Sequence, residues 1–241
     1  MNLIITMAGK YIRFRKAGYN QPKFLLPLIG HNSVFREVLE QLVAGYDFEN
    51  IIFVANKADF EYKSAIEKVI MDSRVINYDL LFIGDTKGQA ETALEAVKVL
   101  EQKGCKSQKI LIHNIDTVLY GRDMSQIRKL LDQHDGCIDV FEAHEQGYSF
   151  VKTSENHLVT EIREKEVISN KATTGLYAFA DMQQYRTYYQ RLKTNREYYI
   201  SFIYDLMLND GKEIAVNSQY SKTLIVGTPA EYELYKTELN H

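Results

Sequence analysis

The 241-residue chain has no tryptophan, only two cysteines and no long run of apolar residues. Cys105 and Cys137 are too few for a disulfide framework and show no metal-ligand spacing, so we expect them to fill structural positions in a reducing compartment. The absence of about twenty consecutive apolar residues excludes a membrane-spanning helix. The apolar start has no basic segment before it and no small-residue cleavage site, so we expect no signal peptide. These absences together predict a cytoplasmic protein.

The chain also carries little net charge. A formal charge of −3 and a pI near 6.1 give no overall attraction to nucleic acid or to an anionic membrane, so we expect neither as a partner. The length is sufficient for one large α/β domain with a sizeable core. Because no repeat, low-complexity tract or linker interrupts the sequence, we predict a single domain over residues 1–241.

Strand-like and helix-like segments alternate through the first half of the chain. Short apolar runs rich in β-branched residues indicate buried strands, and apolar residues at helical spacing indicate the helices between them. The expected strands are residues 2–8, 51–55, 78–83 and 109–113, and the expected helices are 32–42, 58–71 and 89–102. This order predicts a Rossmann-like α/β fold, with a mixed, mainly parallel sheet and helices on both faces. Such sheets bind ligands at the carboxyl ends of their strands.

The second half of the chain has a different pattern. Short alternating or apolar segments at 147–153, 157–162 and 174–179 indicate a mixed or antiparallel extension of the sheet. Helices are expected at 181–193, at 198–209 before Gly211, and from Pro229 onward, with a strand at 213–217. We interpret the tyrosine pairs at 188–189 and 198–199 as half-buried helix packing, with a pocket lining as the alternative.

A strongly basic segment follows the first strand. Residues 10–23 hold five cations in fourteen positions and no acid, directly after Gly9. Backbone N–H groups at a glycine turn can point at phosphate oxygens, and neighbouring Arg or Lys side chains supply charge. The pattern therefore favours a loop that meets an anion, although a solvated loop has the same composition.

This opening resembles the sugar nucleotidyltransferase family, the pyrophosphorylases of nucleotide sugars. The family signature is a strand, then roughly Ala/Gly-Gly-x-Gly-x-Arg-Phe/Leu, a variable loop, and Pro-Lys-x-Leu-x-Pro. The matching residues are Ala8-Gly9, Arg13-Phe14 and Pro22-Lys23-Phe24-Leu25-Leu26-Pro27. The second glycine of the turn is replaced by Tyr11. Either the turn takes another route past the nucleotide, or nucleotide binding has been lost.

Two further segments resemble nucleotide and metal motifs of the family. Gly88-Gln89-Ala90-Glu91-Thr92-Ala93 opens a helix that in the family lies against the nucleobase, so the resemblance implies that Gly88 and Gln89 bind the base. Asn114-Ile115-Asp116 follows a strand where the family has an aspartate for Mg²⁺, a hard cation that suits carboxylate and phosphate oxygens. The family's second acid would precede Gly227-Thr228-Pro229, but Ile225 stands there.

The resemblance also implies an acceptor site in the second half. The segment ending in Glu164-Lys165 is similar to a family strand whose lysine contacts the acceptor phosphate, and Gly175 begins a Gly-x-Tyr-x-Phe strand like the next one. Glu197 stands at a helix start where the family glutamate can bind acceptor hydroxyls. A solvated edge strand and a helix-dipole role are the alternatives for Lys165 and Glu197.

The whole resemblance implies a GT-A-like nucleotidyltransferase that uses Mg²⁺, a nucleoside triphosphate and a small phosphorylated acceptor. Residues 1–140 would bind the nucleotide through Ala8, Gly9, Lys10 and Tyr11, and residues 141–241 the acceptor. Arg13 would contact the triphosphate and Lys23 the α-phosphate as catalytic residues. The short chain resembles compact enzymes of capsule and surface-polysaccharide assembly, which favours CTP or UTP, and relatives often form homodimers.

Two other functions remain open at this point. A glycosyltransferase of related architecture would use Asn114-Ile115-Asp116 for a nucleotide-sugar, but it needs fewer cations than the basic segment provides. A non-catalytic nucleotide-binding paralogue would explain Tyr11 and Ile225. Pyrophosphate release distinguishes the transferase from both.

Overall fold

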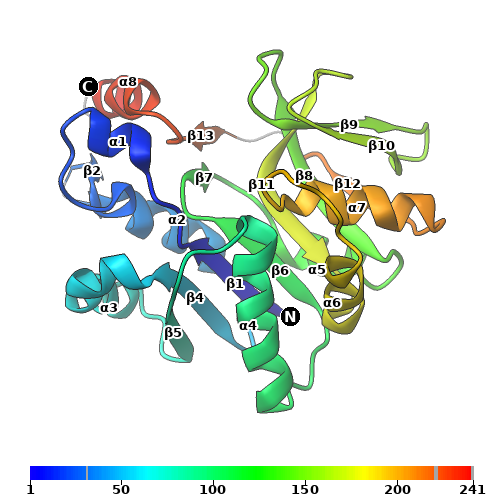
Figure 1. The fold of residues 1–241 in the computed structure, drawn as a ribbon, viewed down its shortest axis with the longest axis horizontal. Helices are drawn as coiled ribbons and strands as arrows, with labels where there is room; N and C mark the ends of the chain where they lie inside the picture. Colours follow the sequence, from blue (N-terminus) through cyan, green and yellow to red (C-terminus); the bar gives the residue numbers. More distant parts are fainter. Residues whose placement is uncertain (31, 220–221, 240–241) are drawn as a thin grey trace.

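The structure, a computed structural model, describes residues 1–30, 32–219 and 222–239. Its main feature is a nine-stranded sheet in which the order is β10-β9-β11-β6-β1-β4-β5, with β8 and then β12 continuing from β11 (Figure 1). Helices pack on both faces of this sheet, as the sequence predicted. In the described part of the chain, no helix is long and apolar enough to cross a membrane.

Four neighbouring strands of the sheet are parallel, and β5 forms its edge. They are β1 (Asn2–Met7), β4 (Ile51–Asn56), β5 (Tyr78–Ile83) and β6 (Ile110–Asn114). β1 lies between β4 and β6, where Ile5 is in register with Phe53 and His113. All six residues of β1 and of β4 are buried, which is why these strands are apolar throughout rather than alternating.

The sheet changes direction at β11 (Lys171–Phe179). This strand is antiparallel to β6 and to β8 (Gly136–Glu142), and one residue pair also joins it to β9 (Ser149–Thr153). β9 forms an antiparallel hairpin with β10 (Val159–Glu164), and β12 (Ile214–Asn217) is parallel to β8. The mixed extension predicted for the second half is therefore present.

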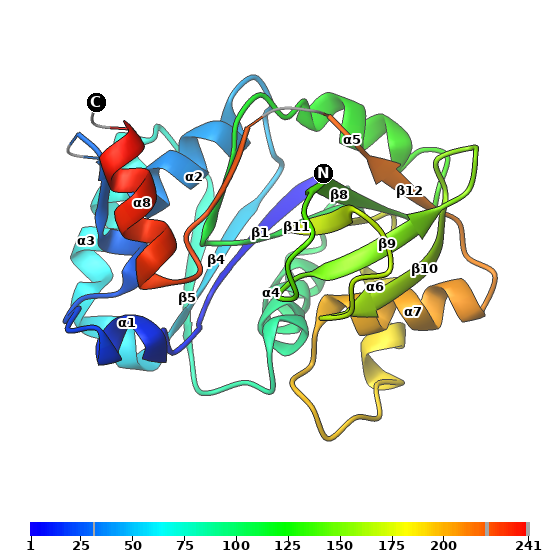
Figure 2. The ribbon, with the colours of Figure 1, turned by 90° about the horizontal axis from the view of Figure 1, so that it is seen from above.

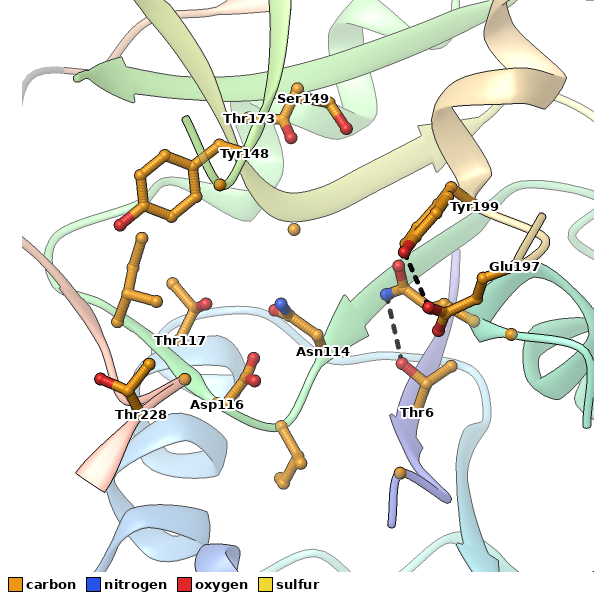
Figure 3. Close-up of a pocket in the computed structure, with 18 of the residues that line it drawn as sticks. Thr6, Asn114, Asp116, Thr117, Tyr148, Ser149, Thr173, Glu197, Tyr199 and Thr228 are labelled. Carbon is orange, nitrogen blue, oxygen red and sulfur yellow. Dashed lines mark hydrogen bonds between the residues drawn. The ribbon is translucent and has the colours of Figure 1, made fainter. Parts of the chain in front are cut away.

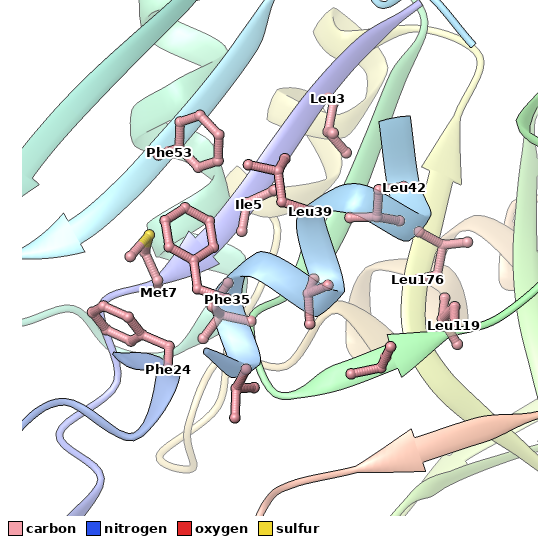
Figure 4. Packing of buried hydrophobic residues seen from close by; sticks show 14 of the residues in the cluster. Leu3, Ile5, Met7, Phe24, Phe35, Leu39, Leu42, Phe53, Leu119 and Leu176 are labelled. Atoms are coloured by element: carbon pink, nitrogen blue, oxygen red, sulfur yellow. The ribbon is translucent and has the colours of Figure 1, made fainter. Parts of the chain in front are cut away.

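The two faces of the central strands bury two separate hydrophobic clusters. Leu3, Ile5 and Met7 of β1 point into one cluster, shown in Figure 4, and Ile4 points into the other. The first cluster is covered by α2 (Val34–Val43), α3 (Lys63–Asp72), α5 (Met124–Leu130) and α8 (Pro229–Leu239). The second is covered by α4 (Gln89–Lys103), α6 (Met182–Gln190) and α7 (Ile200–Asn209).

Several short elements differ from the sequence prediction. The segment predicted as a loop contains α1 (Ile12–Lys16) and the 3₁₀ helix η1 (Lys23–Leu25), because Phe14 and Phe24 are buried and fix it to the core. The helix expected at 58–71 begins as a 3₁₀ helix, η2 (Lys57–Tyr62). The helices expected at 181–193 and 198–209 are shorter than predicted, since α6 ends at Gln190 and α7 begins at Ile200.

Some elements were missed altogether. These are α5, β8, β2 (Pro27–Ile29), β3 (Asn32–Ser33), β7 (Thr117–Leu119) and β13 (Thr223–Ile225). The two-stranded pairs β2–β3 and β7–β13 are too short for a clear sequence period. β8 was not recognised in the sequence because Asp139, a charged residue, stands in the middle of this buried strand.

The last segment of the chain returns to the first. β13 pairs with β7, and α8 packs beside α1 and β2 (Figures 1 and 2). The Tyr232 hydroxyl donates a hydrogen bond to the Pro27 carbonyl at 2.7 Å. The C-terminal helix is therefore a structural part of the nucleotide-binding half that the sequence predicted for residues 1–140.

Asp139 is held by a buried ion pair. Arg122 Nε lies 3.0 and 3.1 Å from the two Asp139 oxygens, and both side chains are 1% exposed. Thr174 Oγ1 and Asn217 Nδ2 also donate to this carboxylate, at 2.9 and 2.5 Å. These contacts join β8, β11 and β12 with the segment before α5.

We expect Arg122→Met to destabilise the protein by about 3–5 kcal/mol, because it leaves the Asp139 carboxylate buried without its cation. Urea unfolding measures the change. The matched control is Arg36→Met, which removes a solvent-exposed pair with Glu40 and should leave the stability nearly unchanged. A loss of less than 1 kcal/mol for Arg122→Met would show that the ion pair does not hold this part of the sheet.

Candidate active site

An open cavity of about 1180 Å³ lies at the carboxyl ends of β1 and β6. The residues after these strands line one side, together with α1, η1 and the start of α4. The β8–β9 loop, β11 and the residues before α7 line the other side, and the segment around β13 and α8 closes one end. The sequence placed the site at these strand ends, and the cavity is there.

The four residues predicted for the phosphate loop lie together in the cavity wall. A side chain at Gly9 would meet no atom within 4 Å, so open space remains in front of this turn. The Ala8 carbonyl accepts a 3.4 Å hydrogen bond from Asn56, and Lys10 Nζ pairs with Asp85 at 2.7 Å. The loop is thus tied to the ends of β4 and β5 and still faces the cavity.

Tyr11 stands where the family has the second glycine of the turn, and its backbone adopts a conformation that favours glycine. Its backbone is left-handed, with φ of 36°, and it precedes the first turn of α1. Its hydroxyl hydrogen-bonds the buried Asp59 carboxylate of η2, and the Arg15 guanidinium lies 4.9 Å from its ring centre. Burial and this contact raise the pKa of the Tyr11 hydroxyl. The side chain is therefore held against η2, while Arg13, two residues later, is exposed and lines the cavity.

Lys23 and Asp116 form an ion pair on the floor of the cavity. Lys23 comes from η1 and Asp116 from the turn between β6 and β7, and their side chains are 15% and 22% exposed. Lys23 Nζ also lies 5.9 Å from the centre of the Phe14 ring. The structure thus brings the predicted catalytic lysine and the predicted metal ligand into direct contact.

The donor atoms at Asp116 fit a magnesium ion that arrives with a nucleotide. Its Oδ1 atom is buried and has no hydrogen-bond partner, so one carboxylate oxygen is available (Figure 3). Across the described ranges, no three acidic, histidine or cysteine side chains are grouped as a metal site. Ile225 lies opposite Thr117 in the β13–β7 pair, so an apolar side chain stands where the family has its second acid. Mg²⁺ commonly uses one or two carboxylates plus phosphate oxygens and waters, so a single carboxylate such as that of Asp116 would be enough on the protein's side.

Gly88 and Gln89 lie at the start of α4 beside the cavity. A Cβ at Gly88 would lie 2.7 Å from the Tyr198 carbonyl oxygen, and its φ is 146°. A glycine is therefore required at position 88, because the backbone of Tyr198, just before α7, lies against it. The sequence alone did not show this reason. Gln89 Nε2 donates a 3.3 Å hydrogen bond to Thr6 Oγ1, which fixes the amide at the end of β1.

Gly175 leaves room for the side chain of Asn114, the first residue of the Asn114-Ile115-Asp116 segment, for which no role was predicted. A Cβ at Gly175 would lie 2.4 Å from the Asn114 amide atoms, and its φ is 88°. Asn114 lies at the centre of the view in Figure 3, and its buried Oδ1 has no hydrogen-bond partner. Gly175 was predicted to bind the acceptor. Its missing side chain leaves the space that the Asn114 amide occupies in the cavity wall.

Lys165 and Glu197, also predicted for the acceptor, are linked through Tyr199. Lys165 Nζ donates to the Tyr199 hydroxyl at 2.5 Å. That hydroxyl donates to Glu197 Oε2 at 2.7 Å, as Figure 3 shows. The hydrogen bond with Tyr199 raises the pKa of the Lys165 ammonium. Tyr199 was interpreted as helix packing, but it lines the cavity, so that interpretation was wrong for this residue.

Glu164 was missed as a site residue. Its carboxylate accepts hydrogen bonds from Ser149 on the neighbouring strand and from Ser201 of α7, the latter at 2.8 Å. Both serines are buried, and Glu164 lines the cavity. Its place beside Lys165 was the only signal in the sequence, and alternating charges on a strand do not show which ones face a cavity.

The C-terminal helix supports the nucleotide side of the cavity. The rings of Phe14, Tyr19 and Tyr232 pack edge to face, with centres 5.5 to 6.3 Å apart. Thr228 and Glu231 form a capping box at the start of α8, in which Glu231 Oε2 accepts from Thr228 N at 2.7 Å. Because Phe14 also faces Lys23, α8 indirectly positions the lysine that was predicted to be catalytic.

His113 lies fully buried on β6, three residues before Asp116. Its Nε2 lies 2.7 Å from the Thr117 carbonyl oxygen, so this nitrogen carries the proton in the neutral ring. Burial lowers the pKa of His113 to about 4. The unfolded chain, in which the ring titrates normally, therefore binds one proton more than the folded chain between these two pKa values.

We expect the protein to lose stability as the pH falls below about 6.5, with His113 contributing about 2 kcal/mol by pH 5. Urea unfolding at both pH values, for the wild type and for His113→Gln, measures this contribution. Burial raises the pKa of Asp139 to about 6, so protonation of Asp139 stabilises the folded state as the pH falls and opposes the effect of His113. Asp139 is present in both proteins, so its contribution cancels when the wild type is compared with His113→Gln. Equal pH dependence in the two proteins would contradict the role of His113.

Comparisons with known proteins agree with this arrangement. The sequence model of the nucleotidyl transferase family matches residues 3–233. The crystal structure of a nucleoside-diphosphate-sugar pyrophosphorylase from Vibrio cholerae RC9 is similar, with a TM-score of 0.84 and 25% identity over 98% of this chain and 100% of that one. No curated protein matches the sequence significantly.

Two more solved structures share the fold at lower identity. The inositol-1-phosphate CTP transferase from T. maritima has a TM-score of 0.75 and 16% identity, over 99% of this chain and 95% of that chain. A UDP-glucose pyrophosphorylase complexed with UDP-glucose has a TM-score of 0.79 and 17% identity, over 98% and 97%. At this level of identity, both structures show a shared fold only.

Proposed function

We propose that this chain, which belongs to the nucleotidyl transferase family, moves a nucleoside monophosphate from CTP or UTP to a small phosphorylated acceptor and releases pyrophosphate. The chain is an enzyme of the nucleotidyltransferase class. The observation that supports the finer proposal is the Lys23–Asp116 pair, which lies in one cavity between the basic loop after β1 and the cluster around Lys165.

The reaction needs positioning and charge neutralisation more than covalent help from the protein. An oxygen of the acceptor phosphate attacks the α-phosphorus of the triphosphate and forms a new P–O bond. The bond from the α-phosphorus to the bridging oxygen of the β-phosphate breaks in line, and its electrons leave with pyrophosphate. Preorganised cations and backbone donors at this centre lower the barrier.

The nucleotide side supplies those groups. Arg13 and Lys10, with the backbone of Ala8, Gly9 and Tyr11, would bind the triphosphate and the leaving pyrophosphate. Asp116 would hold Mg²⁺, which would supply positive charge to the phosphate oxygens of the nucleotide. Because Lys23 is paired with Asp116 in the structure, binding of a cation at Asp116 would release the Lys23 ammonium toward the α-phosphate.

The remaining predicted residues complete the assignment. Gly88 and Gln89 would contact the base, and Lys165, Gly175 and Glu197 would bind the acceptor. Residues 1–140 would then serve the nucleotide and residues 141–241 the acceptor, except for α8, which packs on the nucleotide side. The compact length supports a product that is an activated donor for capsule or surface polysaccharide. A non-catalytic nucleotide-binding paralogue is the second candidate, because Ile225 leaves Asp116 without its partner acid.

We expect CTP or UTP to raise the melting temperature in the presence of Mg²⁺, because a ligand that binds only the folded state stabilises it by about 2.7 kcal/mol at a hundred times its Kd. Thermal shift with CTP, UTP, dTTP, ATP and GTP, each with and without Mg²⁺, measures this. A response to none of the five would contradict the nucleotide site.

We expect Lys23→Ala to lower kcat by roughly 10²–10³, the typical effect of losing one electrostatic donor to the transition state. Pyrophosphate release with the nucleotide identified by thermal shift provides the rate. Lys16→Ala is the matched control, since Lys16 lies on α1 but outside the cavity lining, and it should keep its activity. A near-wild-type rate for Lys23→Ala would remove the lysine from the mechanism, and nucleotide binding without turnover of any acceptor would favour the paralogue.

A further inference from the structure

The two sides of the cavity differ in how their charges are compensated. On the nucleotide side, Lys10 pairs with Asp85 and Lys23 pairs with Asp116. On the acceptor side, one ammonium, that of Lys165, faces four glutamates that line the cavity, namely Glu142, Glu145, Glu164 and Glu197. Within residues 1–30, 32–219 and 222–239, none of these four forms an ion pair with a lysine or arginine; Glu142 has only His144 at 3.8 Å.

Neutral groups hold the two inner carboxylates. Glu164 accepts from the hydroxyls of Ser149 and Ser201, and Glu197 accepts from the hydroxyl of Tyr199. These hydrogen bonds fix the positions of the carboxylates but bring no positive charge, so the Lys165 ammonium is the cation that interacts with both of them and the four glutamates still outnumber it. Uncompensated charges of one sign in a cleft focus the potential and raise the local concentration of a ligand of the opposite sign.

Lys165 shows where an ammonium group is bound on this side. Its Nζ atom lies 4.5 Å from the centre of the Tyr199 ring and donates to the Tyr199 hydroxyl at 2.5 Å. The ring face and the neighbouring glutamates thus form an environment that stabilises an ammonium ion. If Lys165 turns to an acceptor phosphate, as the proposed function requires, this place is left without a cation.

We infer that the acceptor carries, besides its phosphate, a positively charged ammonium group, which binds between Glu164, Glu197 and the Tyr199 ring when Lys165 contacts the phosphate. The inference rests on the proposed function and narrows its acceptor class. The hydroxyls of a neutral polyol can donate hydrogen bonds to the glutamates but bring no charge, whereas an ammonium ion supplies both. The ammonium group takes no part in bond formation, which stays between the acceptor phosphate oxygen and the α-phosphorus.

The same ammonium chemistry is found in amino-sugar phosphates and in phosphorylated amino alcohols, so the experiment uses one matched pair of each. Glucosamine 1-phosphate is compared with glucose 1-phosphate, and phosphoethanolamine with 2-hydroxyethyl phosphate. Within each pair only an ammonium and a hydroxyl differ. Pyrophosphate release by the full chain, with the nucleotide selected by thermal shift and Mg²⁺, gives kcat/KM for all four compounds.

We expect the ammonium member of at least one pair to have a kcat/KM about tenfold or more above that of its hydroxyl partner. The pair that shows the difference identifies the source of the ammonium. Glu164→Gln and Glu197→Gln keep the shape of the side chain, and each should reduce this ratio toward one. Glu155→Gln, in the exposed turn between β9 and β10, is the control that removes one charge from the same hairpin and should keep the ratio.

Equal or better use of the hydroxyl members would overturn the inference and leave the proposed function intact. If no acceptor is turned over, calorimetric titration of the four compounds into the protein saturated with nucleotide and Mg²⁺ decides: selective binding of an ammonium member supports the inference, and equal binding or none overturns it. If no nucleotide binds in the thermal shift assay, the proposed function and the inference fail together.

Discussion

The ion pair between Lys23 and Asp116 is the contact around which the cavity is arranged. Asp116 is placed by β6, a central strand of the sheet, and Lys23 by a short 3₁₀ helix that the burial of Phe24 fixes to the core. The two residues are 93 positions apart in the chain, so the pair forms only when β1, which precedes Lys23, and β6, which precedes Asp116, lie side by side. A cation and a carboxylate that are both partly desolvated attract each other more strongly than they would in water. The folded protein therefore keeps the two groups in position while no substrate is bound.

The main elements of this fold were predictable because their signals are local. β1, β4 and β6 are continuous apolar runs, and α2 begins at Ser33, whose hydroxyl accepts a hydrogen bond from the Arg36 backbone. β8 was not predictable, because the charge of Asp139 is compatible with a buried strand only once Arg122 lies against it. That pairing is a property of the tertiary structure and leaves no periodic pattern in the sequence.

In the candidate site, too, features with a local sequence signal were predictable and contacts between distant segments were not. The resemblance singled out Gly9, Lys23 and Asp116, and all three line the cavity, while their roles stay predictions. Each was recognisable because it belongs to a short continuous motif. The contacts between distant segments were not visible: the reason for Gly88 is the backbone at Tyr198, and the reason for Gly175 is Asn114. Tyr199 and Glu164 gave no distinctive signal, because a tyrosine at a helix start and a glutamate on a strand are ordinary surface residues until the other side of a cavity is known.

The packing of α8 has a consequence for the synthesis of the protein. Tyr232 contacts Phe14 and hydrogen-bonds Pro27, a residue 205 positions earlier. The ribosome therefore makes the segment after β1 long before the helix that supports it. A nascent chain can form β1 and its neighbours while Phe14 still lacks the ring of Tyr232 as a packing partner. The conformation of the segment after β1 is consequently completed only when α8 has been made and has packed against it.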